Sequence, residues 1–258
     1  MLRIICFVDH EIGYRILKSL LQTQSDIKIV AVVTTTDNAT MWWPSVEKLC
    51  THFSTPCFIY PDSKKTIINF GNIDYIFLLS WKHIIPKEIF NMPAKATINL
   101  HYSLLPKLKG VYPVNWAIIK GETYTGITFH VVDETIDGGP LLLQKKILIH
   151  SSDTARTLQL RLDDLAVKGF AELLEKAKKG SLCPIPQKEQ QNQSYYTKKD
   201  YEKSNELDLN EITSVSKIIN LIRGKTFLPE NKSLYFRCPQ TGSKCYIRLE
   251  LDCSSDEK

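Results

Sequence analysis

The 258-residue sequence lacks the features that identify several large classes of protein. It contains no Cys-x-x-Cys pair, and Cys50, His52 and Cys57 do not have the paired spacing of a zinc site. No apolar run approaches the roughly 18–20 residues that a membrane-spanning helix needs. The apolar N-terminus turns polar by Asp9, which is too early for the core of a secretory signal. We therefore expect a cytoplasmic protein without a metal, whose seven cysteines are reduced thiols.

A glycine-rich nucleotide fingerprint and a strong charge are missing too. The first strand-like run is followed by a turn with one glycine, Gly13, so a nicotinamide dinucleotide has little support. The formal net charge is +5, with 24% charged residues, which is ordinary for a globular protein. This charge suits a substrate that carries phosphates, but it is too diffuse to indicate nucleic acid. No internal repeat is present.

What the chain does contain is an alternation of buried strands and amphipathic helices. Continuous apolar runs rich in β-branched residues predict strands at residues 2–8 and 27–33, with a helix between them. We predict further strands at residues 56–60, 75–79, 96–99, 127–132 and 141–149, and helices at 42–53, 62–72, 86–90, 112–120 and 154–178. This order predicts an α/β fold with a mostly parallel sheet and helices on both faces.

The composition changes after Gly180. Residues 187–201 are polar and poor in aliphatic side chains, which predicts a linker or long loop. A helix is predicted at 211–223, and paired strands at 234–237 and 244–251. We thus expect a main domain at residues 1–180 and a C-terminal module of linker, helix and β-hairpin at 181–258. So small a module would bury little area alone, and it should pack on the main domain or pair with another subunit.

Three chemically useful side chains occur within residues 97–142. Asn99 and His101 are two apart at the end of a predicted strand, so an extended chain projects them to the same face. Asp137 lies in an Asp-Gly-Gly-Pro turn, which can hold a carboxylate at the rim of a cleft. Together they could supply an oxyanion donor, a proton shuttle and a group that orients the shuttle, as acyl transfer needs. A lone histidine or a turn aspartate is also common in a purely structural role.

His10 and Glu11 directly follow the first predicted strand. Open α/β sheets bind ligands at the carboxyl ends of their strands, so both residues are candidate ligand contacts. An equally good interpretation of Glu11 is that it favours the positive end of the helix dipole.

Residues 97–142 closely resemble the formyltransferase family that uses 10-formyltetrahydrofolate. That family carries Asn-x-His, then Ser-Leu-Leu-Pro, and an Asp 36 positions after the His; here Asn99, His101, residues 103–106 and Asp137 match in order and spacing. The resemblance covers roughly residues 1–180. It implies a Rossmann-like fold, transfer of a formyl group to an amine, and catalytic roles for Asn99, His101 and Asp137.

The resemblance also implies which residues bind the two substrates. The 10-formyltetrahydrofolate co-substrate would contact His83, Ile84, Ile85, Val132, Asp133 and Ile136. The second substrate would enter near His10 and Glu11, with Lys82 available to a phosphate and Phe227 available to stack on a base. The apolar residues of this set could equally be ordinary core, and Phe227 could anchor the C-terminal module.

The choice of acceptor divides the family into branches. Glycinamide-ribonucleotide formylation uses shorter chains, whereas methionyl-tRNA formylation uses longer chains with a sizeable β-barrel. Residues 110–122, residues 222–229 and the short hairpin tail resemble the third branch, which formylates nucleotide-linked amino sugars for surface polysaccharides. The implied substrate is dTDP-4-amino-4,6-dideoxyglucose or a close 3-amino or 4-amino relative, and the implied assembly is a homodimer through the hairpin. Methionyl-tRNA formylation and a non-catalytic folate-binding homologue remain the alternatives.

Overall fold

The structure is a computed structural model that describes residues 1–23, 26–37, 43–62, 64–188, 194–227, 233–247 and 249. The chain forms two compact units, each described here by itself. The first consists of Met1–His101, Thr128–Gln144 and Leu165–Lys188, and the second of Tyr102–Ile127, Lys145–Asp164 and Glu189–Lys258. These units are groups of residues in contact, and they do not test the domain boundary that we predicted at residue 180.

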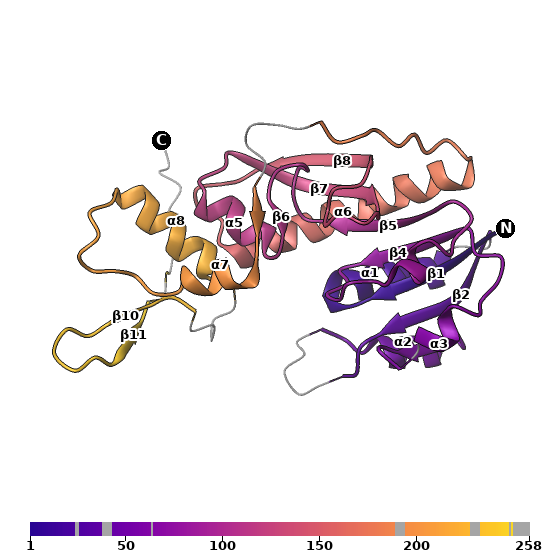
Figure 1. Ribbon diagram of the computed structural model, residues 1–258, viewed down its shortest axis with the longest axis horizontal. Coiled ribbons are helices and arrows are strands. Elements are labelled where there is room, and N and C mark those ends of the chain that lie inside the picture. Colours follow the sequence, from indigo (N-terminus) through magenta and orange to yellow (C-terminus); the bar gives the residue numbers. More distant parts are fainter. Residues whose placement is uncertain are drawn as a thin grey trace, which may run out of the picture. The chain divides into compact units, whose positions relative to one another are not determined.

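Seven strands form the main sheet, in the order β3-β2-β1-β4-β5-β7-β8 (Figure 1). Their bounds are β1 (Leu2–Val8), β2 (Ile27–Thr34), β3 (Cys57–Ile59), β4 (Tyr75–Leu79), β5 (Ala96–His101), β7 (Tyr124–Val131) and β8 (Leu141–Leu148). β1 pairs in parallel with β2 and β4, and β5 is parallel to β4 but antiparallel to β7. The predicted α/β fold with a mostly parallel sheet is confirmed.

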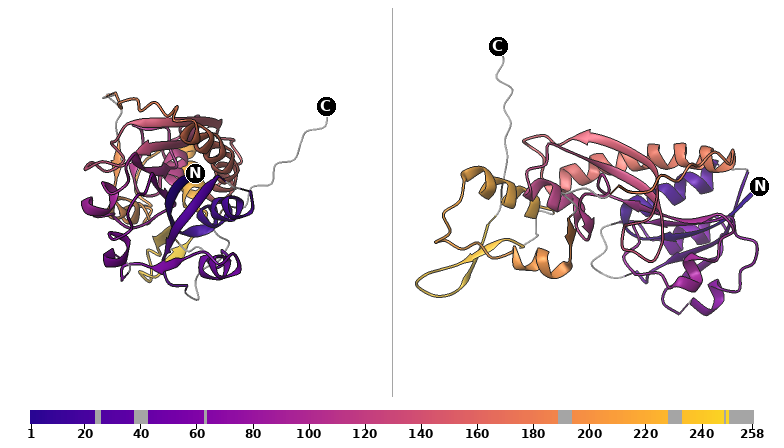
Figure 2. Two further views of the ribbon diagram at one scale, coloured as in Figure 1. Left: turned by 90° about the vertical axis from the view of Figure 1, so that its right-hand side faces the viewer. Right: turned by 45° about the horizontal axis from the view of Figure 1, so that its top comes forward.

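Helices cover both faces of this sheet (Figures 1 and 2). They are α1 (His10–Thr23), α2 (Val46–His52), α3 (Lys64–Ile67), α4 (Lys87–Phe90) and α6 (Ala155–Lys178). On one face, Phe77 of β4 packs edge-on against Phe170 of α6, with ring centroids 5.1 Å apart. On the other face, Phe7 belongs to an apolar cluster with Ile67 of α3 and Ile89 of α4. Cover on both faces explains why the strands have continuous apolar runs instead of alternation.

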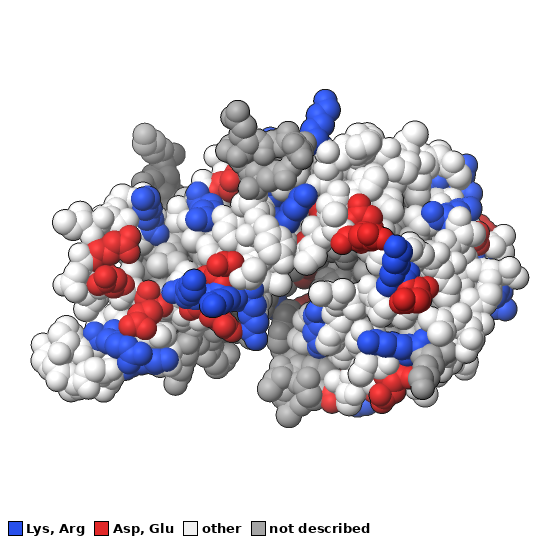
Figure 3. Space-filling view, viewed as in Figure 1, with Lys and Arg blue, Asp and Glu red and all other residues white. Residues whose placement is uncertain are grey.

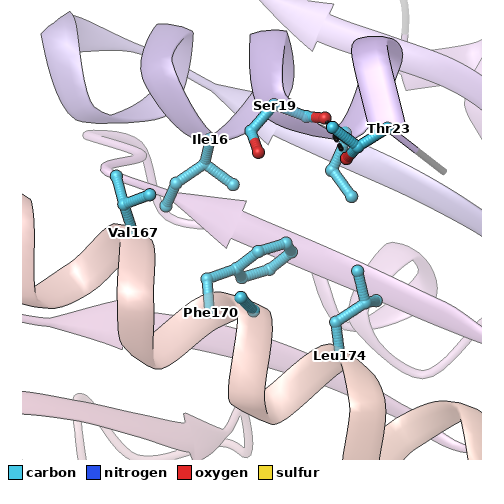
Figure 4. Close-up of a pocket in the computed structure, with 8 residues that line it drawn as sticks. Ile16, Ser19, Thr23, Val167, Phe170 and Leu174 are labelled. Atoms are coloured by element: carbon cyan, nitrogen blue, oxygen red, sulfur yellow. Dashed lines mark hydrogen bonds between the residues drawn. The ribbon is translucent and has the colours of Figure 1, made fainter.

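A crevice of about 50 Å³ lies where α1 crosses α6 (Figure 4). Ile16 of α1 and Val167, Phe170 and Leu174 of α6 line it. None of its lining residues belongs to the predicted site, and apart from Ser19 and Thr23 they are apolar, as in a packing gap between two helices.

The second unit is built around α5 (Pro113–Ile119) and α8 (Val215–Lys225). Its other elements are β6 (Lys109–Gly110), β9 (Tyr195–Tyr196), α7 (Lys198–Lys203), β10 (Tyr235–Arg237) and β11 (Lys244–Tyr246). A Cβ on Gly224 would lie 2.5 Å from the Ile119 side chain, so the glycine permits the close approach of α8 to α5. The Asn115 side-chain amide donates to the Gly224 carbonyl oxygen at 2.8 Å. β10 and β11 form the antiparallel hairpin that the sequence predicts.

The structure corrects several predicted elements. The helix predicted at 62–72 is the single turn α3, and the helix predicted at 42–53 is the shorter α2. The stretch at 187–201 is not only a linker, because it contains β9 and the start of α7, which a Thr197–Asp200 capping box stabilises. Residues 38–42, and 248 and 250–251 of the last predicted strand, lie outside the described residues. None of the helices in the described part of the chain is both long and apolar enough to cross a bilayer.

Candidate active site

The end of β5 positions Asn99 and His101. Pairing with β7 places Asn99 opposite His130 and His101 opposite Thr128. Asn99 and His101 are two apart in this regular strand, so both side chains project to one face, as predicted. His101 is buried, with 6% of its surface exposed, whereas Asn99 is half-buried. The strand therefore directs an amide and an imidazole toward the same region of the first unit.

The turn after β7 brings Asp137 to these two residues. Asp137 Oδ2 lies 3.5 Å from His101 Nδ1, and Asp137 Oδ1 lies 3.5 Å from Asn99 Nδ2. Asp137 has a φ of 51°, a left-handed conformation that costs an L-residue about 1 kcal/mol. A Cβ on Gly139 would lie 2.0 Å from the Val131 carbonyl oxygen, so only glycine fits at this position. The structure thus brings the three predicted catalytic residues together.

His130 is a fourth member of the cluster, and the sequence did not single it out. Its Nδ1 lies 2.9 Å from the Val131 carbonyl oxygen, which can only accept, so we assign the proton to Nδ1. Its Nε2 lies 3.1 Å from Asn99 Nδ2 and 3.5 Å from Asp137 Oδ1. In this tautomer Nε2 accepts a hydrogen bond from the Asn99 amide. His130 therefore orients the amide group of Asn99.

This arrangement has the chemical groups that acyl transfer requires. Asn99 can offer its second N–H to a developing oxyanion, and His101 can exchange a proton while Asp137 accepts a hydrogen bond from its ring. The 3.5 Å separations are long for hydrogen bonds, which is common in catalytic groups before a substrate closes the site. The side chain of Asp137 is 12% exposed, so the carboxylate is partly shielded from water but reachable.

A second polar cluster lies at the carboxyl ends of β1, β2 and β4. Asp9 is buried, and its carboxylate forms an ion pair with Lys82 Nζ at 2.9 Å and accepts from Thr35 Oγ1 at 3.2 Å. His10 Nδ1 lies 3.1 Å from both the carbonyl oxygen and the hydroxyl of Ser80. The predicted contacts His10 and Lys82 therefore lie in the cluster that Asp9 and Ser80 join, and Glu11 lies in the first turn of α1.

The two loops predicted to contact the folate lie close to each other. Lys87, at the start of α4, forms an ion pair with Glu134 of the loop after β7. This contact raises the pKa of Lys87. Ile84 in the first loop is 82% exposed and Ile136 in the second is 51% exposed, which is unusual for side chains so apolar.

The other predicted folate contacts have additional structural roles. The His83 ring lies against the Tyr60 ring, with centroids 5.0 Å apart. Ile85 is buried in the same apolar cluster as Phe7, and Val132 packs against this cluster. Both observations agree with the alternative that these two residues are ordinary core. Asp133 accepts hydrogen bonds from the backbone N–H and the hydroxyl of Thr135, which shapes the loop.

Phe227 belongs to the second unit, where the Arg156 guanidinium carbon lies 5.8 Å from its ring centroid. Its predicted contact with a base stays a prediction. Among the residues that the structure describes, no group of three or more His, Cys, Asp or Glu could hold a metal ion.

The Asn99–His101–Asp137 cluster offers groups suited to acyl transfer, and comparison with known proteins assigns the chain to a family of transferases. Residues 2–174 match the formyl transferase family, and the chain belongs to it. Residues 200–252 match the N-formyltransferase dimerization C-terminal domain. The family resemblance predicted from the sequence is confirmed.

Individual relatives differ in how much of the chain they match. The methionyl-tRNA formyltransferase of Thermodesulfovibrio yellowstonii is 40% identical over 153 residues, which are 59% of this chain and 48% of that protein. The chain thus matches about half the length of this curated relative. A 4-N formyltransferase from Francisella tularensis has a similar structure, with a TM-score of 0.84, 22% identity and 98% of each chain covered. An N-formyltransferase from Helicobacter canadensis, solved with folinic acid and dTDP-3-aminofucose, has a TM-score of 0.73 and 22% identity, covering 87% of this chain and 80% of that one.

Proposed function

We propose that this protein transfers a formyl group from 10-formyltetrahydrofolate to the amino group of a nucleotide-linked amino sugar. The observation that carries the proposal is the position of the Asp137 carboxylate, which lies 3.5 Å from both His101 Nδ1 and Asn99 Nδ2. Membership of the formyl transferase family supplies the reaction type. The sugar is a dTDP-linked 4-amino or 3-amino deoxysugar, such as dTDP-4-amino-4,6-dideoxyglucose, made for surface polysaccharides.

In the proposed reaction each residue of the cluster has one task. The formyl carbon exchanges its bond to the folate nitrogen for a bond to the sugar amine, and the amine loses a proton. The Asn99 N–H that is not bonded to His130 donates to the formyl oxygen as negative charge develops on it. His101 takes the proton, directly or through water, and returns it to the departing folate nitrogen, while Asp137 orients the imidazole and stabilises its transient charge. His130 keeps the Asn99 amide in the orientation that donates.

The residues proposed to hold the folate suit an aromatic heterocycle. Contact with the ring system would bury the exposed apolar side chains of Ile84 and Ile136. Burial of apolar surface stabilises a complex by roughly 25 cal/mol per Å². Trp81 Nε1 is a buried donor without a hydrogen-bond partner among the described residues, beside the loop that carries Ile84. An orphaned donor and exposed apolar side chains are the features expected where a polar ring system binds.

The Asp9–Lys82 cluster supports a phosphate-bearing acceptor. Lys82 is 41% exposed while its partner Asp9 is buried, so the ammonium group is tethered by Asp9 and still reachable from solvent. A tethered cation at the carboxyl ends of β1 and β4 lies where open α/β sheets bind ligands. This placement supports the predicted substrate contacts His10, Glu11 and Lys82.

Methionyl-tRNA formylation is the second candidate, because the 40% identity with such an enzyme favours it. Two observations weigh against it. Residues 200–252 match a dimerization domain of N-formyltransferases, and the tail has nine Asp and Glu residues between positions 200 and 256. On the face shown in Figure 3, basic and acidic side chains are intermixed instead of forming the dense basic surface that favours nucleic acid.

The same C-terminal match supports a homodimer. Residues 200–252 include α8 and the β10–β11 hairpin, and Leu209, Ile212, Val215 and Ile219 are large apolar residues exposed before and along α8. We propose that this module, including its hairpin, pairs two copies of the chain. The expected cytoplasmic location stays a prediction.

The experiment that tests the function mixes the purified protein, 10-formyltetrahydrofolate and a panel of amines. The panel contains dTDP-linked 4-amino and 3-amino deoxysugars, glycinamide ribonucleotide and charged initiator tRNA. Release of tetrahydrofolate with formylation of a dTDP-amino sugar alone supports the proposal and identifies the carbon that carries the amine. Formylation of the tRNA instead establishes the second candidate, and no release with any amine points to a non-catalytic folate-binding homologue.

A further inference from the structure

We propose that Gln187 is a positioning residue for formyl transfer, because its side chain holds the backbone of the turn that carries Asp137. The inference rests on the proposed role of the Asp137 carboxylate. It extends the site to the segment after α6, which the sequence predicts as part of a linker.

Gln187 contacts the turn through both N–H groups of its side-chain amide. Nε2 donates to the carbonyl oxygen of Asp137 at 2.9 Å and to that of Gly139 at 2.8 Å. Carbonyl oxygens only accept, so the amide must face them with its nitrogen. Its Oε1 is buried and has no hydrogen-bond partner among the residues that the structure describes. The two turn carbonyls therefore determine how this amide is oriented.

The conformation of the turn makes this restraint important. Asp137 is in the left-handed region, with a φ of 51°, which non-glycine residues seldom adopt. A hydrogen bond to its own carbonyl oxygen directly restrains the peptide plane that follows it. The Asp137 carboxylate lies 3.5 Å from both His101 and Asn99, so a small backbone shift would break both contacts.

The segment that carries Gln187 is itself held against the sheet. Leu141 and Ile185 exchange N–H···O hydrogen bonds of 2.8 Å in both directions. Leu141 begins β8 directly after the turn, and Ile185 precedes Gln187 by two residues. All these residues belong to the first unit. The chain after α6 thus returns to the start of β8 and delivers the Gln187 amide to the turn.

Removal of the amide should affect the rate more than substrate binding. A displacement of about 1 Å at a catalytic group can cost about 10²-fold in rate. Gln187→Ala should therefore lower kcat by about 10- to 100-fold, while KM for 10-formyltetrahydrofolate changes by less than about threefold. Gln187→Glu keeps the length but lacks both N–H groups, and it should be at least as slow. Lys188→Ala, the exposed neighbour, is the matched control and should keep near wild-type kinetics.

The deciding experiment is a double-mutant cycle with Asp137→Asn, assayed with 10-formyltetrahydrofolate and dTDP-4-amino-4,6-dideoxyglucose. If Gln187 acts through Asp137, Gln187→Ala should change the residual rate of the Asp137→Asn variant by less than about twofold. An equal loss in both backgrounds, or a Gln187→Ala variant with kcat within twofold of wild type, overturns the inference. A wild-type rate in Asp137→Asn alone overturns the role given to the Asp137 carboxylate, and with it the inference. Absence of formyl transfer to this sugar by the wild-type protein overturns the proposed function instead.

A second measurement does not depend on activity. Deuterium uptake by backbone amides of residues 133–141 should accelerate in Gln187→Ala, while uptake by α1 stays unchanged and shows that the fold is intact. Unchanged uptake at residues 133–141 contradicts the inference even if the acceptor proves to be a different amine.

Discussion

Asn99 and His130 face each other across β5 and β7, and the Asn99 amide nitrogen lies 3.1 Å from His130 Nε2. The pairing joins a residue that the sequence predicts as catalytic to one that it does not single out. Because the other imidazole nitrogen is committed to the Val131 carbonyl oxygen, Nε2 is left as an acceptor. The orientation of the Asn99 amide thus depends on the proton position in a buried histidine.

His130 variants test this dependence. His130→Leu removes the acceptor, and kcat should fall roughly tenfold. This factor corresponds to the net free energy of one hydrogen bond. His130→Gln can present an amide oxygen to Asn99 and should recover much of the rate. Steady-state kinetics on both variants provide the comparison. Equal rates for the leucine and glutamine variants would show that the hydrogen bond does not matter.

The Asp137 turn should not tolerate a side chain at Gly139. A Cβ there would lie 2.0 Å from the Val131 carbonyl oxygen, so Gly139→Ala must move the turn. We expect a loss of about 1–3 kcal/mol in the free energy of unfolding and a lower kcat. Gly71→Ala is the control, because a Cβ on Gly71 would meet nothing within 4 Å. Urea unfolding that gives both variants the same stability would contradict the packing argument.

The C-terminal module should control self-association. Ile212→Glu places a charge on the exposed apolar surface before α8, and Tyr246→Glu places one on the hairpin. Each variant should shift the protein from dimer to monomer in sedimentation velocity, whereas Ile68→Glu, an exposed residue of the first unit, should not. A loss of dimer in only one of the two variants identifies which surface pairs. A wild-type monomer would refute the proposed assembly.

Lys225 should make stability depend on pH. Burial lowers its pKa to about 7 from an ordinary value of 10.5, although Nζ donates at 2.7 Å to the Tyr201 carbonyl oxygen and to Asn205 Oδ1. Between these two pKa values the unfolded chain binds the proton and the folded chain releases it. The free energy of unfolding should therefore rise with pH from about 7 to 10, by at most about 1.4 kcal/mol per unit. Below pH 7 Lys225 is protonated in both states, so its contribution to the free energy of unfolding no longer changes with pH.

Lys225→Met isolates this contribution. The Tyr201 ring centroid lies 3.3 Å from Lys225 Nζ. Burial raises the pKa of Tyr201 to about 12, so its hydroxyl stays neutral between pH 7 and 9. Urea unfolding at pH 7, 8 and 9 should therefore give a steeper rise in the wild type than in the methionine variant. Parallel curves would show that the buried amine does not titrate on unfolding.

Local rules predict where the three candidate residues lie, and the family resemblance implies their catalytic roles. Asn99 and His101 share a face by the period of a strand, and Asp137 lies in a turn that its Gly-Gly-Pro sequence indicates. The sheet could be predicted for a similar reason, since strands buried on both faces have continuous apolar runs.

His130 and Gln187 could not be predicted because their roles depend on long-range pairing. His130 meets Asn99 only because β5 pairs with β7 in one register, and a shift of one residue would turn it to the other face. Gln187 lies in a polar stretch, and its contact with Asp137 spans 50 positions. β9 and α7 were missed because each is short and has few apolar residues, so composition alone indicated a linker.

The most direct test of the account is the single-turnover rate of formyl transfer by Asp137→Asn, with 10-formyltetrahydrofolate prebound and a dTDP-amino sugar added. The substitution keeps the shape of the side chain but removes the charge that faces His101 Nδ1. The account predicts a fall of at least about 10²-fold, with folate affinity and the unfolding midpoint close to wild type. A single-turnover rate near that of the wild type would contradict the central role of the Asn99–His101–Asp137 cluster.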